Sequence, residues 1–161
     1  MNLFIIRHAI AEERTDDGDD TQRALTKEGR EKFKEAVAGL KALGYRFDRL
    51  YHSPWRRAVE TAEEAAKLVD GELTALDALA GPPRDALLSE LRGVDVAVVG
   101  HEPWLGELIA WLVTGELGLG AHFVMKKGGV AWLEGTAQPG KMTLRALLPP
   151  KVLRAASRSS R

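Results

Sequence analysis

The feature that most constrains the fold is an apolar run near the N-terminus, Leu3-Phe4-Ile5-Ile6, which is followed at once by Arg7 and His8. Four apolar residues in a row are typical of a strand buried on both faces, as the strands of parallel sheets are. Ligands of such sheets bind beyond the carboxyl ends of the strands. The run therefore predicts a central strand that delivers an arginine and a histidine to a binding site.

Strand and helix patterns alternate along the rest of the chain. Thr26 can cap a helix whose apolar residues recur every 3.6 positions until Gly44 ends it. Ser53 and Pro54 open a second helix, as N-cap and first helical position, and a third begins near Pro103. Strands are expected at residues 49–52, 72–76, 94–99, 129–133 and 142–148, and a weak helix at 85–91.

This alternation predicts a three-layer α/β/α sandwich with a mainly parallel sheet. The last two strands, joined around Gln138-Pro139-Gly140, are expected to form an antiparallel hairpin at its edge. A chain of 161 residues has single-domain length, and we expect that domain to span residues 1–148. Residues 149–161 carry basic side chains and no acid, which predicts a basic, flexible tail.

Charge and composition exclude several classes of function. The 23 Lys and Arg residues balance 23 Asp and Glu residues, so we expect neither nucleic acid nor a membrane as partner. The chain has no cysteine, and its four histidines show no metal-ligand spacing, so neither a metal nor another cofactor is expected. No apolar run suits a signal peptide or a membrane span, which favours the cytoplasm. The oligomeric state is left open.

Three strand-to-helix junctions carry basic or imidazole side chains. Arg7 and His8 follow the first strand, Arg57 lies in the first turn of the second helix, and His101 follows Gly100. Because parallel strands end at the same edge of a sheet, these side chains are expected to surround one pocket. Guanidinium groups and helix N-termini both bind phosphate, so the pocket is predicted to hold a phosphoryl group.

In this order the motifs resemble those of the histidine phosphatase superfamily, the phosphoglycerate-mutase-like enzymes. Arg7-His8-Ala9 is similar to the Arg-His-Gly/Ala run of that family, and Gly100-His101 to its late Gly-His. Between them, Ser53 is followed by Arg57-Ala58 and Thr61, as in the second family motif. The resemblance covers residues 3 to about 134 and implies a phosphoglycerate-mutase-like fold.

Within the superfamily, the short chain looks most like the small bacterial phosphohistidine phosphatases, which act on phosphohistidine in proteins. Two stretches, Arg23 to Gly29 and Gly100 to Pro103, carry this resemblance. Other members usually have a glutamate as proton donor after the third strand, where this chain has Ala78. Asp77 is a candidate substitute, although a strand would turn its side chain the other way. A missing acid favours a phosphohistidine substrate, because an imidazole is a better leaving group than an alkoxide.

The predicted reaction is a two-step displacement. His8 attacks phosphorus as a neutral nucleophile, and water then hydrolyses the phosphohistidine enzyme. The phosphoryl oxygens are stabilised by Arg7, Arg57 and protonated His101. The second ring nitrogen of His8 should donate to a backbone carbonyl that fixes its tautomer. Substrate contacts are expected from Arg23 and Ser53.

Two other functions stay open at the level of sequence. One is a small-molecule phosphomonoesterase acting on a sugar phosphate or nucleotide, and the other is a non-catalytic phosphohistidine-binding module.

Structural roles are expected for several remaining residues. Arg56 should pair with a surface carboxylate, Trp104 and Trp111 should pack in the interior, and residues 12–20 should form a solvated acidic loop.

Overall fold

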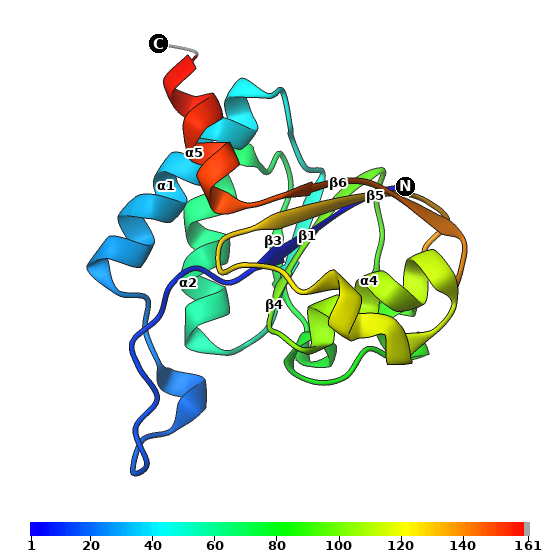
Figure 1. Cartoon of the computed structure of the whole chain (residues 1–161), viewed down its shortest axis with the longest axis horizontal. Helices are drawn as coiled ribbons and strands as arrows, with labels where there is room; N and C mark the ends of the chain where they lie inside the picture. The colour runs from blue at the N-terminus through cyan, green and yellow to red at the C-terminus, as the bar shows by residue number, and fades with distance from the viewer. Residues whose placement is uncertain (160–161) are drawn as a thin grey trace.

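A six-stranded mixed sheet forms the centre of the computed structural model, which describes residues 1–159 (Figure 1). The strands are β1 (Asn2–Arg7), β2 (Arg49–His52), β3 (Leu73–Ala75), β4 (Asp95–Gly100), β5 (Val130–Gly135) and β6 (Met142–Leu148). Their order across the sheet is β3-β2-β4-β1-β5-β6, with β1 to β4 parallel and β5 and β6 antiparallel. This confirms the predicted parallel sheet with an antiparallel edge.

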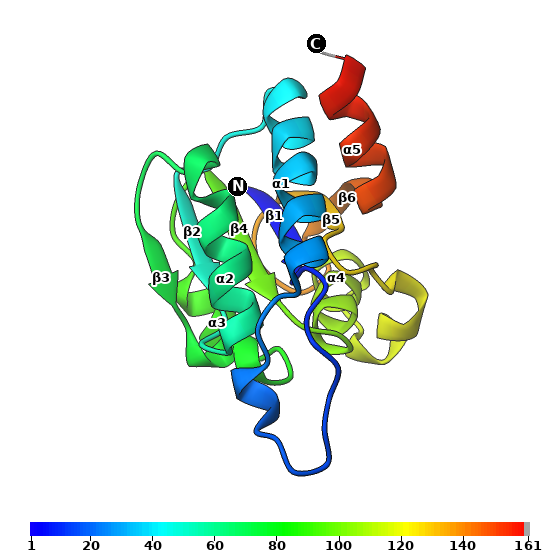
Figure 2. The same cartoon turned by 90° about the vertical axis from the view of Figure 1, so that its left-hand side faces the viewer.

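Helices cover both faces of the sheet (Figures 1 and 2). One face carries α1 (Lys27–Ala42), α2 (Arg56–Ala65) and α5 (Pro150–Ser159), and the other carries α3 (Asp85–Glu90) and α4 (Trp104–Thr114). Short 3-10 helices are η1 (Asp20–Gln22), η2 (Ala66–Leu68), η3 (Asp77–Ala80) and η4 (Leu117–Phe123). Among residues 1–159, no helix is long and apolar enough to cross a membrane.

The apolar run of β1 lies in the middle of this sandwich and contributes to both interior layers. Phe4 and Ile6 pack on the side of α1, α2 and α5, and Leu3 and Ile5 pack on the side of α4. All four side chains are buried. The run therefore has no polar residue because neither of its faces meets water.

The starts of the first two long helices show one correct and one incorrect prediction. Thr26 caps α1 as expected, and its hydroxyl accepts from the Gly29 N–H at 2.9 Å. The predicted start of the second helix at Pro54 is wrong, because α2 begins at Arg56 and Ser53 is not its N-cap. The Ser53 hydroxyl is fully buried and lies 2.7 Å from the His101 ring instead.

The expectation of a flexible tail is wrong for residues 150–159, which form α5 packed along α1. Leu153 is fully buried in this contact. At Gly39 a Cβ atom would lie only 1.9 Å from the Leu153 carbonyl oxygen, so only glycine permits this approach. The prediction relied on the basic composition and overlooked that the segment is an amphipathic helix. This helix buries Leu153 and Ser157, which lie one turn apart. Residues 160–161 lie outside the described part, and the domain boundary at residue 148 stays a prediction.

Candidate active site

A cavity of about 360 Å³ lies beyond the carboxyl ends of β1, β2 and β4, three neighbouring strands. The three predicted junctions meet here, as the parallel order of these strands requires. The lining includes every residue predicted to be catalytic and one predicted to bind substrate: Arg7, His8, Arg57, His101 and Arg23. Ser53, the other residue predicted to bind substrate, does not line the cavity. Its hydroxyl contacts the ring of His101, which does.

His8 is held as a neutral imidazole with one ring nitrogen free to react. Its Nδ1 atom lies 2.7 Å from the Ala9 carbonyl oxygen and donates to it, which confirms the expected hydrogen bond. The lone pair is therefore on Nε2, which accepts from the Arg57 Nε–H at 3.3 Å. Burial, together with the charges of Arg57 and Arg7, lowers the pKa of His8 to about 3, although the hydrogen bond to Ala9 acts in the opposite direction. At neutral pH this lone pair is present.

His101 is oriented by Ser53. The Ser53 Oγ atom accepts from the Trp55 backbone N–H at 3.2 Å and lies 2.7 Å from His101 Nε2. Because Ser53 is fully buried, its hydroxyl proton is satisfied by donation to Nε2. The proton of the neutral ring then sits on Nδ1, which has no acceptor in the described protein.

His101 is neutral in the free protein, whereas the predicted protonated His101 belongs to the site with a phosphoryl group bound and stays a prediction. Burial, with smaller contributions from the neighbouring His8 imidazole and the Arg57 guanidinium, lowers the pKa of His101 to about 3. A ring that is 2 % exposed among cations has too little solvation to carry a second proton. His101 therefore offers a neutral N–H donor from Nδ1.

Arg57 is fixed by a carboxylate that sequence reasoning missed. Its Nη1 donates to the Asp20 carbonyl oxygen at 2.7 Å, and its Nη2 pairs with the Asp20 carboxylate at 3.2 Å. Asp20 also accepts from Arg23 Nε at 2.7 Å. Burial raises the pKa of the Asp20 carboxyl, but the charges of Arg57 and Arg23 outweigh this and leave the pKa below its usual value. Asp20 thus anchors two arginines at the cavity.

The fold of the N-terminal loop explains why Asp20 was missed. A bridge between Ala11 and Leu25 closes this loop, and η1 then packs against α2. Figure 2 shows the loop in blue beyond the lower ends of α1 and α2. The expectation of a solvated loop is therefore wrong at Asp20. The only local signal was Arg23 three residues later, which is the spacing of their ion pair.

Arg7 also lines the cavity, and a backbone carbonyl holds its guanidinium in place. Its Nη1 donates to the Met125 carbonyl oxygen at 2.6 Å. Among residues 1–159, the two buried side-chain atoms without a hydrogen-bond partner are Arg7 Nε and His101 Nδ1. Buried donors in proteins are nearly always paired. Two unpaired N–H groups at one cavity are what an oxyanion would satisfy.

Two tryptophans form an aromatic wall that sequence reasoning also missed. The Arg57 guanidinium carbon lies 4.7 Å from the ring centre of Trp55. Trp104 lies edge to face with Trp55 at 5.7 Å and with His101 at 6.1 Å. The expectation that Trp104 only packs is therefore incomplete, since it also lines the cavity. By contrast, Arg56 pairs with Glu60 at 3.0 Å on the surface, as predicted.

The cavity has two carboxylates, and both are engaged. Asp20 binds the arginines, whereas Glu102 accepts from the Met125 N–H at 3.0 Å and from the Gly106 N–H at 3.2 Å. Asp77 is exposed and does not line the cavity. The argument that a strand would turn Asp77 away does not apply, because it begins η3. In the described residues, no group of three or more potential metal ligands is present.

The neutral histidines make stability depend on pH. Their folded pKa values lie near 3, below the ordinary value of 6.5, so the unfolded chain binds more protons between these limits. Acid therefore favours unfolding, and the stability present above pH 6.5 is lost as the pH falls toward 3. We expect the free energy of unfolding to fall by about 1.4 kcal/mol per pH unit for each histidine.

Urea unfolding of the wild type and of His101→Asn between pH 7 and pH 5 measures this contribution. The variant should show a shallower decline, because it lacks one of the two buried imidazoles. Equal slopes for the two proteins would show that His101 takes up its proton as easily in the folded protein as in the unfolded chain.

Comparison with known proteins gives one family model, one relative and several solved structures. The family model "Histidine phosphatase superfamily (branch 1)" matches residues 3–81. An uncharacterized protein of Picosynechococcus sp. (strain ATCC 27264 / PCC 7002 / PR-6) is 33% identical over 147 residues, which are 85% of this chain and 87% of the relative.

Among solved structures, the protein histidine phosphatase SixA complexed with tungstate is 27% identical, with a TM-score of 0.77. The alignment covers 95% of this chain and 99% of SixA. Phosphoserine phosphatase from Entamoeba histolytica, in complex with 3-phosphoglyceric acid, shares the fold at 18% identity and a TM-score of 0.70. That alignment covers 94% of this chain and 98% of the other.

Proposed function

Because the chain belongs to the histidine phosphatase superfamily (branch 1), we propose that it is a cytoplasmic phosphohistidine phosphatase acting on a signalling or phosphotransfer protein. The observation that carries the proposal is the state of His8. Its Nε2 lone pair faces the cavity beside Arg57 while Nδ1 is committed to the Ala9 carbonyl. A neutral, oriented imidazole among fixed cations is suited to nucleophilic attack on phosphorus.

In the first step the His8 Nε2 lone pair forms a bond to phosphorus, and the bond from phosphorus to the leaving group breaks. Negative charge on the phosphoryl oxygens is met by the guanidinium groups of Arg7 and Arg57 and by the Nδ1–H of His101. The Arg57 Nε–H, which the lone pair accepts in the free protein, becomes available to a phosphoryl oxygen. The positive charges are fixed beforehand by Asp20 and the Met125 carbonyl, so little reorganisation is needed.

In the second step a water oxygen forms a new bond to phosphorus, and the bond from phosphorus to His8 Nε2 breaks. The electron pair returns to Nε2, and the product leaves as dihydrogen phosphate, which carries the oxygen and both protons of the water. The Nδ1–H stays on the Ala9 carbonyl throughout, so the ring recovers its starting tautomer. The enzyme is then ready for another turnover.

The carboxylates at the cavity favour a substrate that needs no strong acid. Asp20 pairs with Arg57, Glu102 accepts from backbone N–H groups, and Asp77 lies outside the cavity. An alkoxide requires a proton as it leaves. A phosphohistidine substrate can carry a proton on the ring nitrogen that is not bonded to phosphorus. When the N–P bond breaks, its imidazole takes the electron pair and leaves as a neutral base. A phosphohistidine substrate is therefore favoured over an alkyl phosphate.

The similarity to SixA supports the same substrate class. SixA is a protein histidine phosphatase, and its structure holds tungstate, an oxyanion like phosphate. The Entamoeba phosphoserine phosphatase has the same fold at lower identity, so fold alone does not select the substrate. The choice of phosphohistidine depends on the arrangement of the cavity and on the closer similarity to SixA.

The proposal is tested by comparing substrates that differ in the leaving atom. The protein is given a histidine-phosphorylated phosphotransfer domain, phosphoramidate and phosphoserine, and phosphate release is measured at pH 7.5. We expect kcat/KM for the two N–P substrates to exceed that for phosphoserine by about 100-fold or more, since only the alkoxide needs an acid. Faster release from phosphoserine would instead show a phosphomonoesterase, and no release from any substrate would contradict phosphatase function.

A further inference from the structure

A second and larger cavity adjoins the catalytic one. It has a volume of about 570 Å³ and lies between α1, α5 and the loop that precedes β5. Arg7 and Lys127 line both cavities, so the two cavities adjoin each other at these residues. We call the second cavity the basic groove, and it is lined by Arg7, Ala9, Ile10, Gly29, Lys32, Phe33, Ala36, Lys126, Lys127, Gly128, Pro150 and Arg154.

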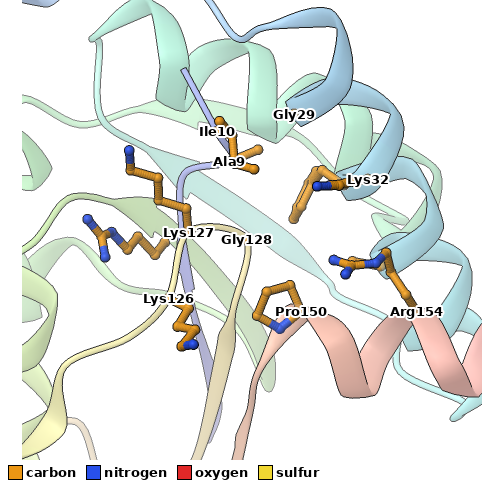
Figure 3. Close-up of a pocket in the computed structure, with 12 residues that line it drawn as sticks. Ala9, Ile10, Gly29, Lys32, Lys126, Lys127, Gly128, Pro150 and Arg154 are labelled. Carbon is orange, nitrogen blue, oxygen red and sulfur yellow. The ribbon is translucent and has the colours of Figure 1, made fainter. Parts of the chain in front are cut away.

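The rim of the basic groove is entirely cationic. Its charged residues are Arg7, Lys32, Lys126, Lys127 and Arg154, and no carboxylate is among the lining residues. Figure 3 shows the charged ends of Lys32 and Arg154 directed toward the hollow from α1 and α5. Lys32 pairs with the exposed Glu28 one helical turn earlier.

Three other cations of the rim have no carboxylate partner in the described part of the chain. Within residues 1–159, no carboxylate forms a salt bridge with Lys126, Lys127 or Arg154. The charge of Lys127 also reaches the catalytic site, where it contributes to lowering the pKa of His8 after burial and the arginines. On a chain with no net charge, this local excess of positive charge favours an anionic occupant.

The floor of the groove is apolar. Phe33 and Ala36 come from α1, Pro150 comes from α5, and Ile10 comes from the chain after β1. Cavities of about 300–1000 Å³ accommodate ligands with several apolar groups and a few well-placed charges. The occupant that fits this surface carries both acidic and apolar groups.

We propose that the basic groove binds an acidic, partly apolar segment that flanks the phosphohistidine of the protein substrate. This inference depends on the proposed function, since the occupant must be attached to the phosphoryl group at His8. Because Arg7 and Lys127 line both cavities, a segment in the groove lies next to the site of the reacting phosphorus. Carboxylates of the segment pair with Lys32, Lys126 and Arg154, and its apolar side chains contact Phe33 and Pro150. The groove thus selects among phosphohistidine proteins by the sequence around the modified histidine.

The test uses three substrates and a double charge reversal, Lys32→Glu with Arg154→Glu. The substrates are a phosphohistidine peptide flanked by leucine and three glutamates, the same peptide with glutamines, and phosphoramidate. We expect the wild type to prefer the glutamate peptide, and the double variant to lose about tenfold in kcat/KM on that peptide alone. Phosphoramidate turnover should be unchanged, because it does not reach the groove.

The matched control is Lys41→Glu with Lys67→Glu, which makes the same change in charge at exposed lysines that line neither cavity. This control should retain the preference for the glutamate peptide. Equal kcat/KM for the two peptides in the wild type would overturn the groove proposal, and so would an equal loss on all three substrates in the double variant. Absence of phosphate release from every substrate would instead contradict the proposed function, which keeps the two failures distinct.

Discussion

Replacing His8 by asparagine is expected to reduce phosphatase turnover by at least about 10³-fold, because the substitution removes the atom that bonds to phosphorus. Asparagine keeps a polar side chain of similar size at a position that is 4 % exposed, so the cavity should retain its shape. The guanidinium groups of Arg7 and Arg57 remain in place. The variant should therefore still bind an oxyanion while it fails to turn over.

Two measurements separate the loss of the nucleophile from loss of the site. Tungstate binding, followed by calorimetry, should stay within about threefold of the wild type, since oxyanion binding depends mainly on the arginines. Rapid quenching with a ³²P-labelled substrate should trap a phosphoenzyme in the wild type and none in His8→Asn. Turnover by His8→Asn near the wild-type rate would refute the covalent mechanism. A wild type that binds tungstate but forms no phosphoenzyme would indicate a binding module.

Replacing Arg57 by glutamine is expected to lower kcat/KM by about 10²- to 10³-fold, the range seen when one fixed donor to transition-state charge is removed. Arg57 is buried, its Nε contacts the nucleophile at 3.3 Å, and Asp20 holds its other nitrogens. Glutamine supplies neither the charge nor the planar fork of donors. The loss should fall mainly on kcat, because the charge on the phosphoryl oxygens is greatest in the transition state.

The neighbouring Arg56 provides the matched control, since the two residues are adjacent in sequence and differ in environment. Arg56 is 54% exposed in its side chain and pairs with Glu60 on the surface of α2. Arg56→Gln should stay within about twofold of the wild-type kcat/KM, because exposed ion pairs contribute little. Equal losses in the two variants would mean that the effect comes from α2 as a whole and not from the Arg57 guanidinium.

The role of Asp20 follows from the same contacts. It sits on the loop between β1 and α1 and binds both Arg57 and Arg23 at the cavity. A carboxylate beside a phosphate site repels the substrate, yet here it holds two guanidinium groups in fixed positions. Its contribution is therefore to position the cations, and the net charge of the cavity lining stays positive.

The sequence alone determined the fold class and indicated Arg7, His8, Arg57 and His101 as pocket residues, but not Asp20 or Trp55. The buried run of β1 and the strand that ends at Gly100 are local patterns, because side chains buried on both faces must be apolar along the whole strand. Arg7 is the last residue of β1, and His8 and His101 each follow such a strand directly. Parallel pairing then brings these strand ends to one edge whatever the details of the loops.

Only the tertiary structure decided the state of each group in the pocket. The proton of His101 depends on Ser53, which is distant in sequence, and the low pKa of both histidines depends on burial by the whole chain. Asp20 reaches Arg57 because the loop folds back, and α5 reaches Gly39 because no side chain separates the backbones. Protonation, ion pairing and close packing are set by distances in space, which residue types along a chain do not specify.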